Sequence, residues 1–453
     1  MSNKFKKGMS LLLTAVMAGA LLAGCGGGDD EQQQVTSNDP NKPYAGTKLK
    51  YAVSSSATEG GETVDLVNFV KEKTGIEIEF TIVPNTNAGE LDKTLVSLTA
   101  GDEMDIVYGT GAKLKDYYKA KVLTPLDELA QNAGYDIQAT FGDNSASFDG
   151  QVYGLPAFKD VWVTFYNKDM FDAANVAYPT AEGWTWEKYI ETAKQLTQGD
   201  KFGSFMLDYD NYNYMYAMQN GAEAYKEGQT ETNFDDPRFA EGVKWFYSLG
   251  NDLKIQPDAV TYASKVYPWN SFVAQDKFGM FVCGSWVSSM LPNKEQYPRE
   301  WKCGVAPMPY PEGQEPSTLY TVGCYAIPST SKNKEAAFEA VKCMAEYQYT
   351  LGYGRIPARV DLTDEEITQY IEEKFAPTYA DDGWTVEEIK TAMFNDNQKM
   401  IPEKIIGPAD TTISKIIIEE TQLYAAGSKS LEDTMSSIKT RSDEAIKEEA
   451  ETE

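Results

Sequence analysis

The pattern of hydrophobic and polar residues between positions 49 and 108 predicts strands and helices in alternation. Val64, Val67 and Val70 have helical spacing within a predicted helix over 63–73. Segment 76–83 alternates apolar and polar residues, as a half-buried strand does. We predict the remaining elements of this region as strands at 49–53 and 104–108 and a helix at 91–99. The resulting β-α-β-α-β order is typical of a parallel, doubly wound sheet.

The loops after two of these strands are candidate ligand loops, because ligands bind beyond the carboxyl ends of strands in such sheets. The loop after Val53 contains Glu59, and the strand at 104–108 ends at Tyr108. Segment 54–61 is rich in serine and glycine, so an ordinary turn explains it equally well.

The same criteria place elements along the rest of the chain. We predict helices at 185–196, 237–250, 268–278 and 335–347, strands at 279–283, 302–308 and 323–327, and a mostly helical tail from 364 that ends in an amphipathic helix at 431–447.

The N-terminus has the three zones of a bacterial export signal. Three lysines among the first seven residues precede an apolar run at 11–22, which is shorter than the ~20 residues that span a bilayer. Residues 22–25 resemble a lipoprotein cleavage motif in which Cys25 accepts a lipid. Residues 26–42 are polar and glycine-rich, as in a flexible linker. A buried helix followed by a chance cysteine is the alternative.

Composition narrows the function further. The net charge of −28 disfavours a nucleic-acid partner, because phosphate binding relies on Lys and Arg. The chain has no histidine, which excludes Ser-His-Asp and Cys-His catalysis and His-ligated zinc. The 28 Tyr, 19 Phe and 8 Trp suit a site that stacks on ligand rings. The mature part contains Cys283, Cys303, Cys324 and Cys343, and their spacing leaves disulfides and free thiols equally open.

Several segments, in order, resemble the family 1 extracellular solute-binding proteins, the maltose-binding-like sugar receptors of ABC importers. Residues 99–107 look like the Gly-Asp-x-Pro-Asp-Val segment of the family, with Met104 where proline is usual. The other similar segments are 153–156, 165–171, 184–187, 272–286, 304–309 and 326–337. Each motif is weak alone, but their shared order is specific.

The resemblance implies an α/β, two-lobed periplasmic-binding-protein-like fold of type II. Each lobe is a doubly wound sheet flanked by helices, with a helical C-terminal region and ligand in the interlobe cleft. We expect a lipoprotein signal peptide at 1–24, the lipidated cysteine and linker at 25–45, an N-lobe from 46–157 plus 305–352, and a C-lobe from 158–304 plus 353–447.

The strand around Asp160 presents polar and aromatic side chains on one face. Asp160 and Trp162 alternate with the apolar Val161 and Val163, which point into the core. In related receptors, the position that matches Asp160 is a sugar-binding carboxylate. The alternative is that Trp162 packs under a loop and that Asp160 is a solvated turn residue.

Two further tryptophans are candidate ligand contacts. Trp286 follows Gly284 and Ser285 at the end of an apolar strand, and the matching tryptophan of the family stacks on sugar. Trp269 lies where a loop enters a predicted helix, and we expect it either to face the cleft or to pack elsewhere.

Three more candidates come from polar segments near the expected cleft. Asn211 and Tyr212 belong to a polar, aromatic run at 208–214, where the family has an aromatic ligand contact. Arg355 lies near the third crossover that the resemblance implies. It either binds a ligand hydroxyl or carboxylate or forms an ion pair across the hinge.

The function that we expect is a lipid-anchored, extracytoplasmic receptor that passes a carbohydrate to the permease subunits of an ABC importer. We expect a monomer that binds no cofactor, metal or nucleic acid and is not an enzyme. A receptor for a non-sugar solute such as a peptide or polyamine, a lipid-anchored glycoside hydrolase and a scaffold without a small ligand are the alternatives.

Overall fold

The computed structural model describes residues 39–54, 61–84, 92–264, 266–395 and 397–452. Cys25 and Glu59 lie outside these ranges. Within them, no helix is long and apolar enough to cross a membrane.

The first elements follow the predicted β-α-β order. Strand β1 (Lys48–Val53) pairs in parallel with β2 (Glu77–Ile82), and α1 (Glu62–Thr74) connects them. α1 ends at Gly75, whose φ of 75° is a left-handed conformation that glycine adopts without strain. α2 (Lys93–Thr99) follows, with Asp92 accepting hydrogen bonds from two backbone N–H groups at its N-terminus.

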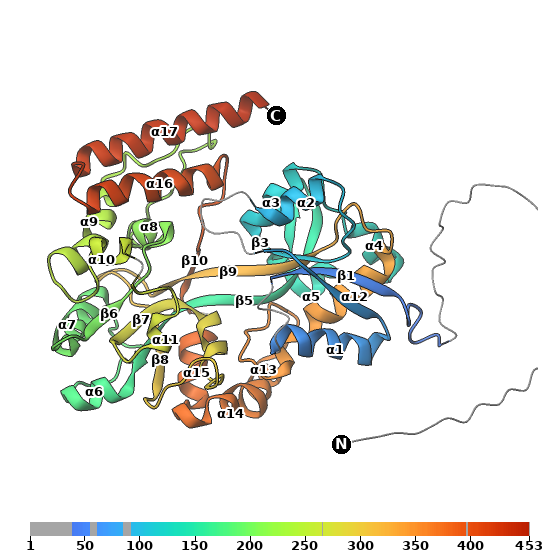
Figure 1. The fold of residues 1–453 in the computed structure, drawn as a ribbon, viewed down its shortest axis with the longest axis horizontal. Coiled ribbons are helices and arrows are strands. Elements are labelled where there is room, and N and C mark those ends of the chain that lie inside the picture. Colours follow the sequence, from blue (N-terminus) through green and yellow to red (C-terminus); the bar gives the residue numbers. More distant parts are fainter. Residues whose placement is uncertain (1–38, 55–60, 85–91, 265, 396, 453) are drawn as a thin grey trace, which may run out of the picture. The chain divides into compact units, whose positions relative to one another are not determined.

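Two strands run between two groups of elements, one around β1 and α1 and the other formed largely by residues 162–307 (Figure 1). β5 (Gln151–Asn167) pairs with β9 (Ser317–Ala326) along its first half and with β7 (Phe278–Gly284) and β8 (Cys303–Pro307) along its second half. β9 also pairs with β3 (Val107–Thr110) and, in parallel, with β10 (Lys399–Pro402). β6 (Phe202–Phe205) pairs in parallel with β7, and β4 (Ala146–Phe148) pairs with β5.

The remaining helices cover these strands. They are α3 (Gly111–Lys119), α4 (Asp127–Asn132), α5 (Ile137–Phe141), α6 (Lys168–Ala174), α7 (Trp186–Leu196), α8 (Asp210–Gln219), α9 (Pro237–Asn251), α10 (Ala259–Ala263), α11 (Ser271–Ala274), α12 (Lys334–Tyr347), α13 (Asp364–Tyr370), α14 (Ala376–Thr378), α15 (Val386–Met393), α16 (Asp410–Ala425) and α17 (Leu431–Thr452), together with a short 3₁₀ helix, η3 (Ser285–Met290).

Two predicted elements need correction. The helix expected over 268–278 is only α11, because the backbone turns extended at Gln275 (φ −136°, ψ 133°) and leads into β7. Strand β9 begins at Ser317, well before the predicted 323. The sequence did not indicate this earlier start because the first residues of the strand are polar. The hydroxyl of Thr318 is buried there and donates a hydrogen bond to the backbone carbonyl of Trp162.

The core divides between the two groups of elements, in keeping with a two-lobed α/β fold. One buried cluster centres on β1, α1 and α12, and another on the second half of β5, β7, α7 and α9. The expected bounds of the two lobes stay a prediction. The four cysteines at 283, 303, 324 and 343 are buried and free.

Candidate functional site

Asp160 contacts the residue before Trp286, where β5 passes the end of β7. The two strands are antiparallel, with Trp162 opposite Gly284, so the residues beyond each end lie close together. The Ser285 hydroxyl donates to Asp160 Oδ1 at 2.7 Å. This hydrogen bond links the carboxylate on β5 to the first residue of η3, immediately before Trp286.

The indole of Trp286 is held at this position by its neighbours. It meets the ring of Trp162 edge to face, with centroids 4.8 Å apart and an interplanar angle of 84°. A Cβ at Gly284 would lie 1.9 Å from the Trp286 ring, so only glycine leaves room for this orientation. Trp286 is half-buried, whereas Trp162 beneath it is only 2% exposed.

Arg355 is held against α1 by a bidentate ion pair. Its Nε lies 3.0 and 2.9 Å from the two Glu62 oxygens, and its Nη2 lies 2.6 Å from Oε2. The guanidinium also stacks over Phe158, 4.2 Å from the ring centroid. Glu62 is the first residue of α1, where the helix dipole favours a negative charge. The sequence left an ion pair as one of two roles for Arg355, and this pair is formed.

Tyr108 completes the group on the first-lobe side. It packs against Phe158 and Tyr325, with ring centroids 6.1 and 5.7 Å away. A Cβ at Gly323 would lie 1.9 Å from the Tyr108 hydroxyl, so the ring needs a glycine on the paired strand.

The charged and polar side chains of this region shift one another's pKa values. Burial raises the pKa of the Asp160 carboxyl, and the nearby Arg355 guanidinium opposes that rise. Burial also raises the pKa of Tyr108, and the negative charge of Asp160 raises it further. Asp160 on β5, Tyr108 on β3 and Arg355 in the segment before α13 therefore form one polar cluster.

Asn211 and Tyr212 are almost fully covered by the protein, each with 1% of its surface exposed. Both are buried in α8, and the Tyr212 hydroxyl donates to the backbone carbonyl of Val282 at 2.7 Å. Tyr212 thus supports β7 beneath Trp286. Tyr209, just before α8, is instead 42% exposed, and the Lys404 ammonium is among the charges that affect its pKa. The polar run therefore contains an aromatic at the surface, three residues before the predicted Tyr212.

Trp269 is 43% exposed and precedes α11, at the opposite end of β7 from Trp286. The structure thus brings together Asp160, Trp162, Trp286, Tyr108 and Arg355, but not Trp269.

Two polar residues on or directly after neighbouring strands, Thr321 and Glu403, were not among the candidates that the sequence indicated. Thr321 is paired with Asp160 in the β5–β9 register, and the Glu403 backbone N–H donates to the carbonyl of Tyr320 at 2.8 Å. The only signal for either residue is the strand register, and β10 is four residues long within a helical tail.

Cavities also mark this region. A hollow of about 470 Å³ includes Tyr108, Asp92 and Lys113 and lies beyond the carboxyl ends of β1 and β2. This is the position that the β-α-β pattern predicts for a ligand loop.

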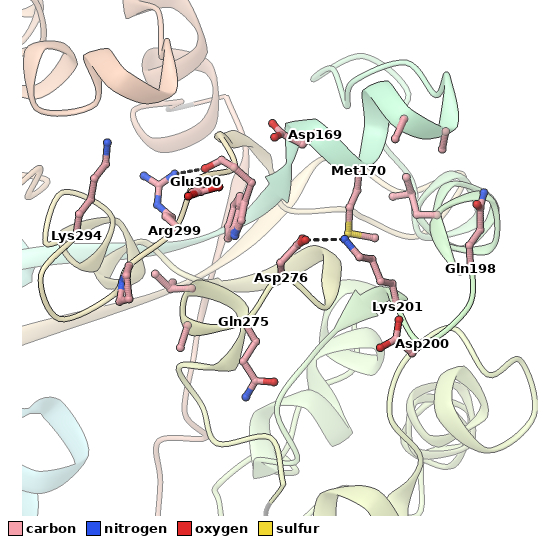
Figure 2. Close-up of a pocket in the computed structure, with 17 residues that line it drawn as sticks. Asp169, Met170, Gln198, Asp200, Lys201, Gln275, Asp276, Lys294, Arg299 and Glu300 are labelled. Carbon is pink, nitrogen blue, oxygen red and sulfur yellow. Dashed lines mark hydrogen bonds and ion pairs between the residues drawn. The ribbon is translucent and has the colours of Figure 1, made fainter.

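A larger cavity of about 890 Å³ lies elsewhere, between α6, the end of α7 and residues 294–301 (Figure 2). Its charged side chains are largely paired with protein groups. Lys201 lies 2.7 Å from Asp276, and the Arg299 guanidinium donates to the carbonyl of Trp301 and pairs with Asp382. This cavity contains none of the predicted ligand residues. Among the described residues, no group of three or more Cys, Asp or Glu side chains is arranged to hold a metal ion.

The crossing strands, the two core clusters and the polar cluster between them define the fold of a two-lobed binding protein. Residues 50–350 match the family model of the bacterial extracellular solute-binding proteins, and the chain belongs to this family.

Relatives of known description are distant. The maltooligosaccharide ABC transporter solute-binding lipoprotein of Streptococcus pneumoniae serotype 4 is 24% identical over 74% of this chain and 76% of its own length. The galactooligosaccharide-binding protein of Bacillus subtilis is 21% identical over 76% and 77%. Putative binding proteins of Brucella abortus are 27% identical over 60% of this chain, and the match spans 65% of their length.

Solved structures support the fold. An ABC substrate-binding protein of Listeria monocytogenes in complex with cycloalternan superposes with a TM-score of 0.72 at 21% identity, over 88% of this chain and 99% of that one. Maltose-bound MalE3 of T. maritima superposes with a TM-score of 0.69 at 18% identity, over 87% and 98%. At these identities the similarity establishes the architecture only.

Proposed function

We propose that the protein is a lipid-anchored, extracytoplasmic receptor that captures an oligosaccharide in the interlobe cleft and delivers it to the permease subunits of an ABC importer. The arrangement of Asp160 beside Trp286 carries the proposal. A sugar presents hydroxyl groups, which a carboxylate accepts, and apolar ring faces, which an indole covers. The names of the Streptococcus and Bacillus relatives, both oligosaccharide receptors, support the same ligand class.

In this proposal the site acts by binding and not by catalysis. Asp160 accepts a hydrogen bond from Ser285, and the nearby Arg355 cation favours its ionised form, so this carboxylate suits the acceptance of ligand hydroxyls. We assign Asp160 the role of a hydroxyl acceptor and Trp286 that of a stacking surface. Trp162, Tyr108 and Arg355 position these two groups or extend the site.

Calorimetry of the full chain against a panel of oligosaccharides, peptides and polyamines tests the ligand class. We expect binding of at least one oligosaccharide, without release of cleaved products. Binding of peptides or polyamines alone refutes the carbohydrate assignment, and the appearance of shorter sugars refutes the receptor role.

The two tryptophans provide a matched pair of variants. Trp286→Ala is expected to weaken sugar binding by at least about tenfold, because a central aromatic contact contributes about 2 kcal/mol or more. Trp269→Ala, which removes an exposed indole from the other end of β7, is expected to leave the affinity unchanged. Equal effects of the two variants would contradict the position that we assign to the site.

The anchor is tested separately from the ligand. Cys25→Ala is expected to release the protein into the medium or periplasm and to leave sugar affinity unchanged, since the linker at 26–42 separates the lipid from the folded part. Retention of the variant at the membrane would contradict the lipid anchor.

A further inference from the structure

We propose that Glu403 is a second ligand carboxylate of this site and that, together with Asp160, it restricts the ligand to uncharged sugars. The inference rests on the proposed function and deepens it, because it assigns a residue and a ligand charge that the similarity to other receptors does not give.

The strand register places the two carboxylates in one row. Asp160 on β5 is opposite Thr321 on β9. On the other side of β9, Pro402 is opposite Tyr320, and the Glu403 N–H donates to the Tyr320 carbonyl. In a parallel pair this hydrogen bond puts Glu403 opposite Thr321. Side chains of residues opposite one another project from the same face of a sheet, so Asp160, Thr321 and Glu403 share a face.

The row has the width of a ligand, since two strand spacings separate the backbones of Asp160 and Glu403 by about 10 Å. Thr321 between them is half-buried and offers a hydroxyl. Both Asp160 and Glu403 are among the charges that raise the pKa of the buried Cys283 thiol, which lies on β7 next to Gly284. Both carboxylates therefore lie near the end of β7 that precedes Trp286.

The cations beside the row are already engaged by protein carboxylates. Lys404 Nζ lies 3.1 Å from a Glu403 oxygen and also pairs with Asp210, so one ammonium serves two carboxylates. Arg355 is held by Glu62 in the bidentate pair described above.

Carboxylates therefore outnumber the cations Lys404 and Arg355 in and beside the row. A carboxylate accepts hydrogen bonds and donates none when ionised, so it suits a sugar hydroxyl that donates. A sugar carboxylate or phosphate would meet Asp160 and Glu403 as like charges, and such contacts strongly disfavour a ligand.

The test compares one neutral oligosaccharide, identified by the calorimetric panel, with the same oligosaccharide oxidised to the carboxylate at C6. We expect the neutral sugar to bind the unaltered chain at least about a hundredfold more tightly, which corresponds to the energy of like-charge contacts. Glu403→Gln is expected to weaken the neutral sugar about tenfold or more, as loss of a hydrogen bond to a charged group does. The same variant is expected to narrow the difference between the two sugars.

Glu419→Gln is the matched control, because Glu419 lies on α16 with a side chain 60% exposed and pairs with Arg441. It is expected to change neither affinity. Melting curves of each variant show whether it is folded.

The outcomes separate this inference from the proposed function. If the oxidised sugar binds as tightly as the neutral one, or if Glu403→Gln binds both sugars like the unaltered chain, the inference is wrong while the receptor function stands. If neither sugar class binds the unaltered chain, the proposed function fails as well.

Discussion

The ion pair between Glu62 and Arg355 joins α1 to the segment that follows α12, and its contribution to stability follows from its burial. Both side chains are only 13% exposed, so solvent screens their attraction weakly. Two unit charges 4 Å apart at an effective dielectric constant of 20 attract by about 4 kcal/mol. Loss of one partner of a buried pair typically costs about 3–5 kcal/mol, because the other charge remains buried without compensation. We therefore expect Glu62→Gln to lower the free energy of unfolding by about 3 kcal/mol, since the amide oxygen still accepts one hydrogen bond.

Urea denaturation followed by tryptophan fluorescence measures this loss as a shift of the midpoint at constant slope. Glu79→Gln is the matched control, because Glu79 pairs with Lys48 at 2.8 Å while both side chains are more than half exposed. Exposed pairs contribute about 0–1 kcal/mol, so the control midpoint is expected to change little. Arg355→Met, made both alone and in the Glu62→Gln background, completes a double-mutant cycle that isolates the coupling between the two groups.

A loss below about 1 kcal/mol for Glu62→Gln, or one equal to that of the control, would refute the reasoning. Such a result would mean that solvent reaches the pair or that Asp160, the neighbouring carboxylate, compensates Arg355 in place of Glu62. A changed slope would instead show that the two groups of elements unfold separately, and the single free energy would then lose its meaning.

Three further variants test other contacts. Gly284→Ala is expected to displace the Trp286 ring, which its Cβ would meet at 1.9 Å, and to abolish sugar binding at a cost of about 1–3 kcal/mol in stability; unchanged calorimetric affinity would contradict the ring position. Lys115→Met is expected to lower the free energy of unfolding, measured by urea denaturation, by about 3 kcal/mol, because it removes the 2.9 Å ion pair of Asp410, whose side chain is only 6% exposed. A decrease of less than about 0.5 kcal/mol would show that the ion pair is dispensable. Asp160→Asn is expected to raise the melting temperature of the protein at pH 7, because burial raises the folded-state pKa of Asp160 and so folding disfavours its ionised form. This gain should disappear below the ordinary carboxyl pKa of 3.8, and a gain in melting temperature that persists there would have another cause.

The sequence predicted the elements whose periodicity comes from one-sided burial. β1, α1 and β2 lie within a residue or two of their expected bounds, because their apolar residues alternate or repeat at helical spacing. The strand at Asp160 was predicted by the same parity rule, and its polar face does carry Asp160 and Trp162. The alternation of side chains along a strand does not show how deeply each one is buried, however. Trp162 lies on the predicted face but is covered by the ring of Trp286.

The contacts that the sequence did not predict join residues far apart in the chain. Glu62 and Arg355 are separated by 293 positions, and neither lies in a pattern that specifies its partner. Glu403 reaches the row of Asp160 only through the pairing of β10 with β9, which is set by three-dimensional packing. Local patterns therefore indicate one half of the proposed site, and the strand register adds the other.

The position of the site on the crossing strands links binding to stability. Asp160 lies on β5 between the two core clusters, and Trp286 enters from the end of β7 in one of them, while Tyr108 and Arg355 contact the other. A ligand that touches both sides binds best to the conformation in which these groups converge, and it shifts the population toward that conformation by its differential affinity. Burial raises the pKa of the Asp160 carboxyl, so its burial opposes folding at neutral pH. A sugar hydroxyl that donates to this carboxylate would recover part of that loss, so we expect ligand binding at Asp160 to stabilise the fold.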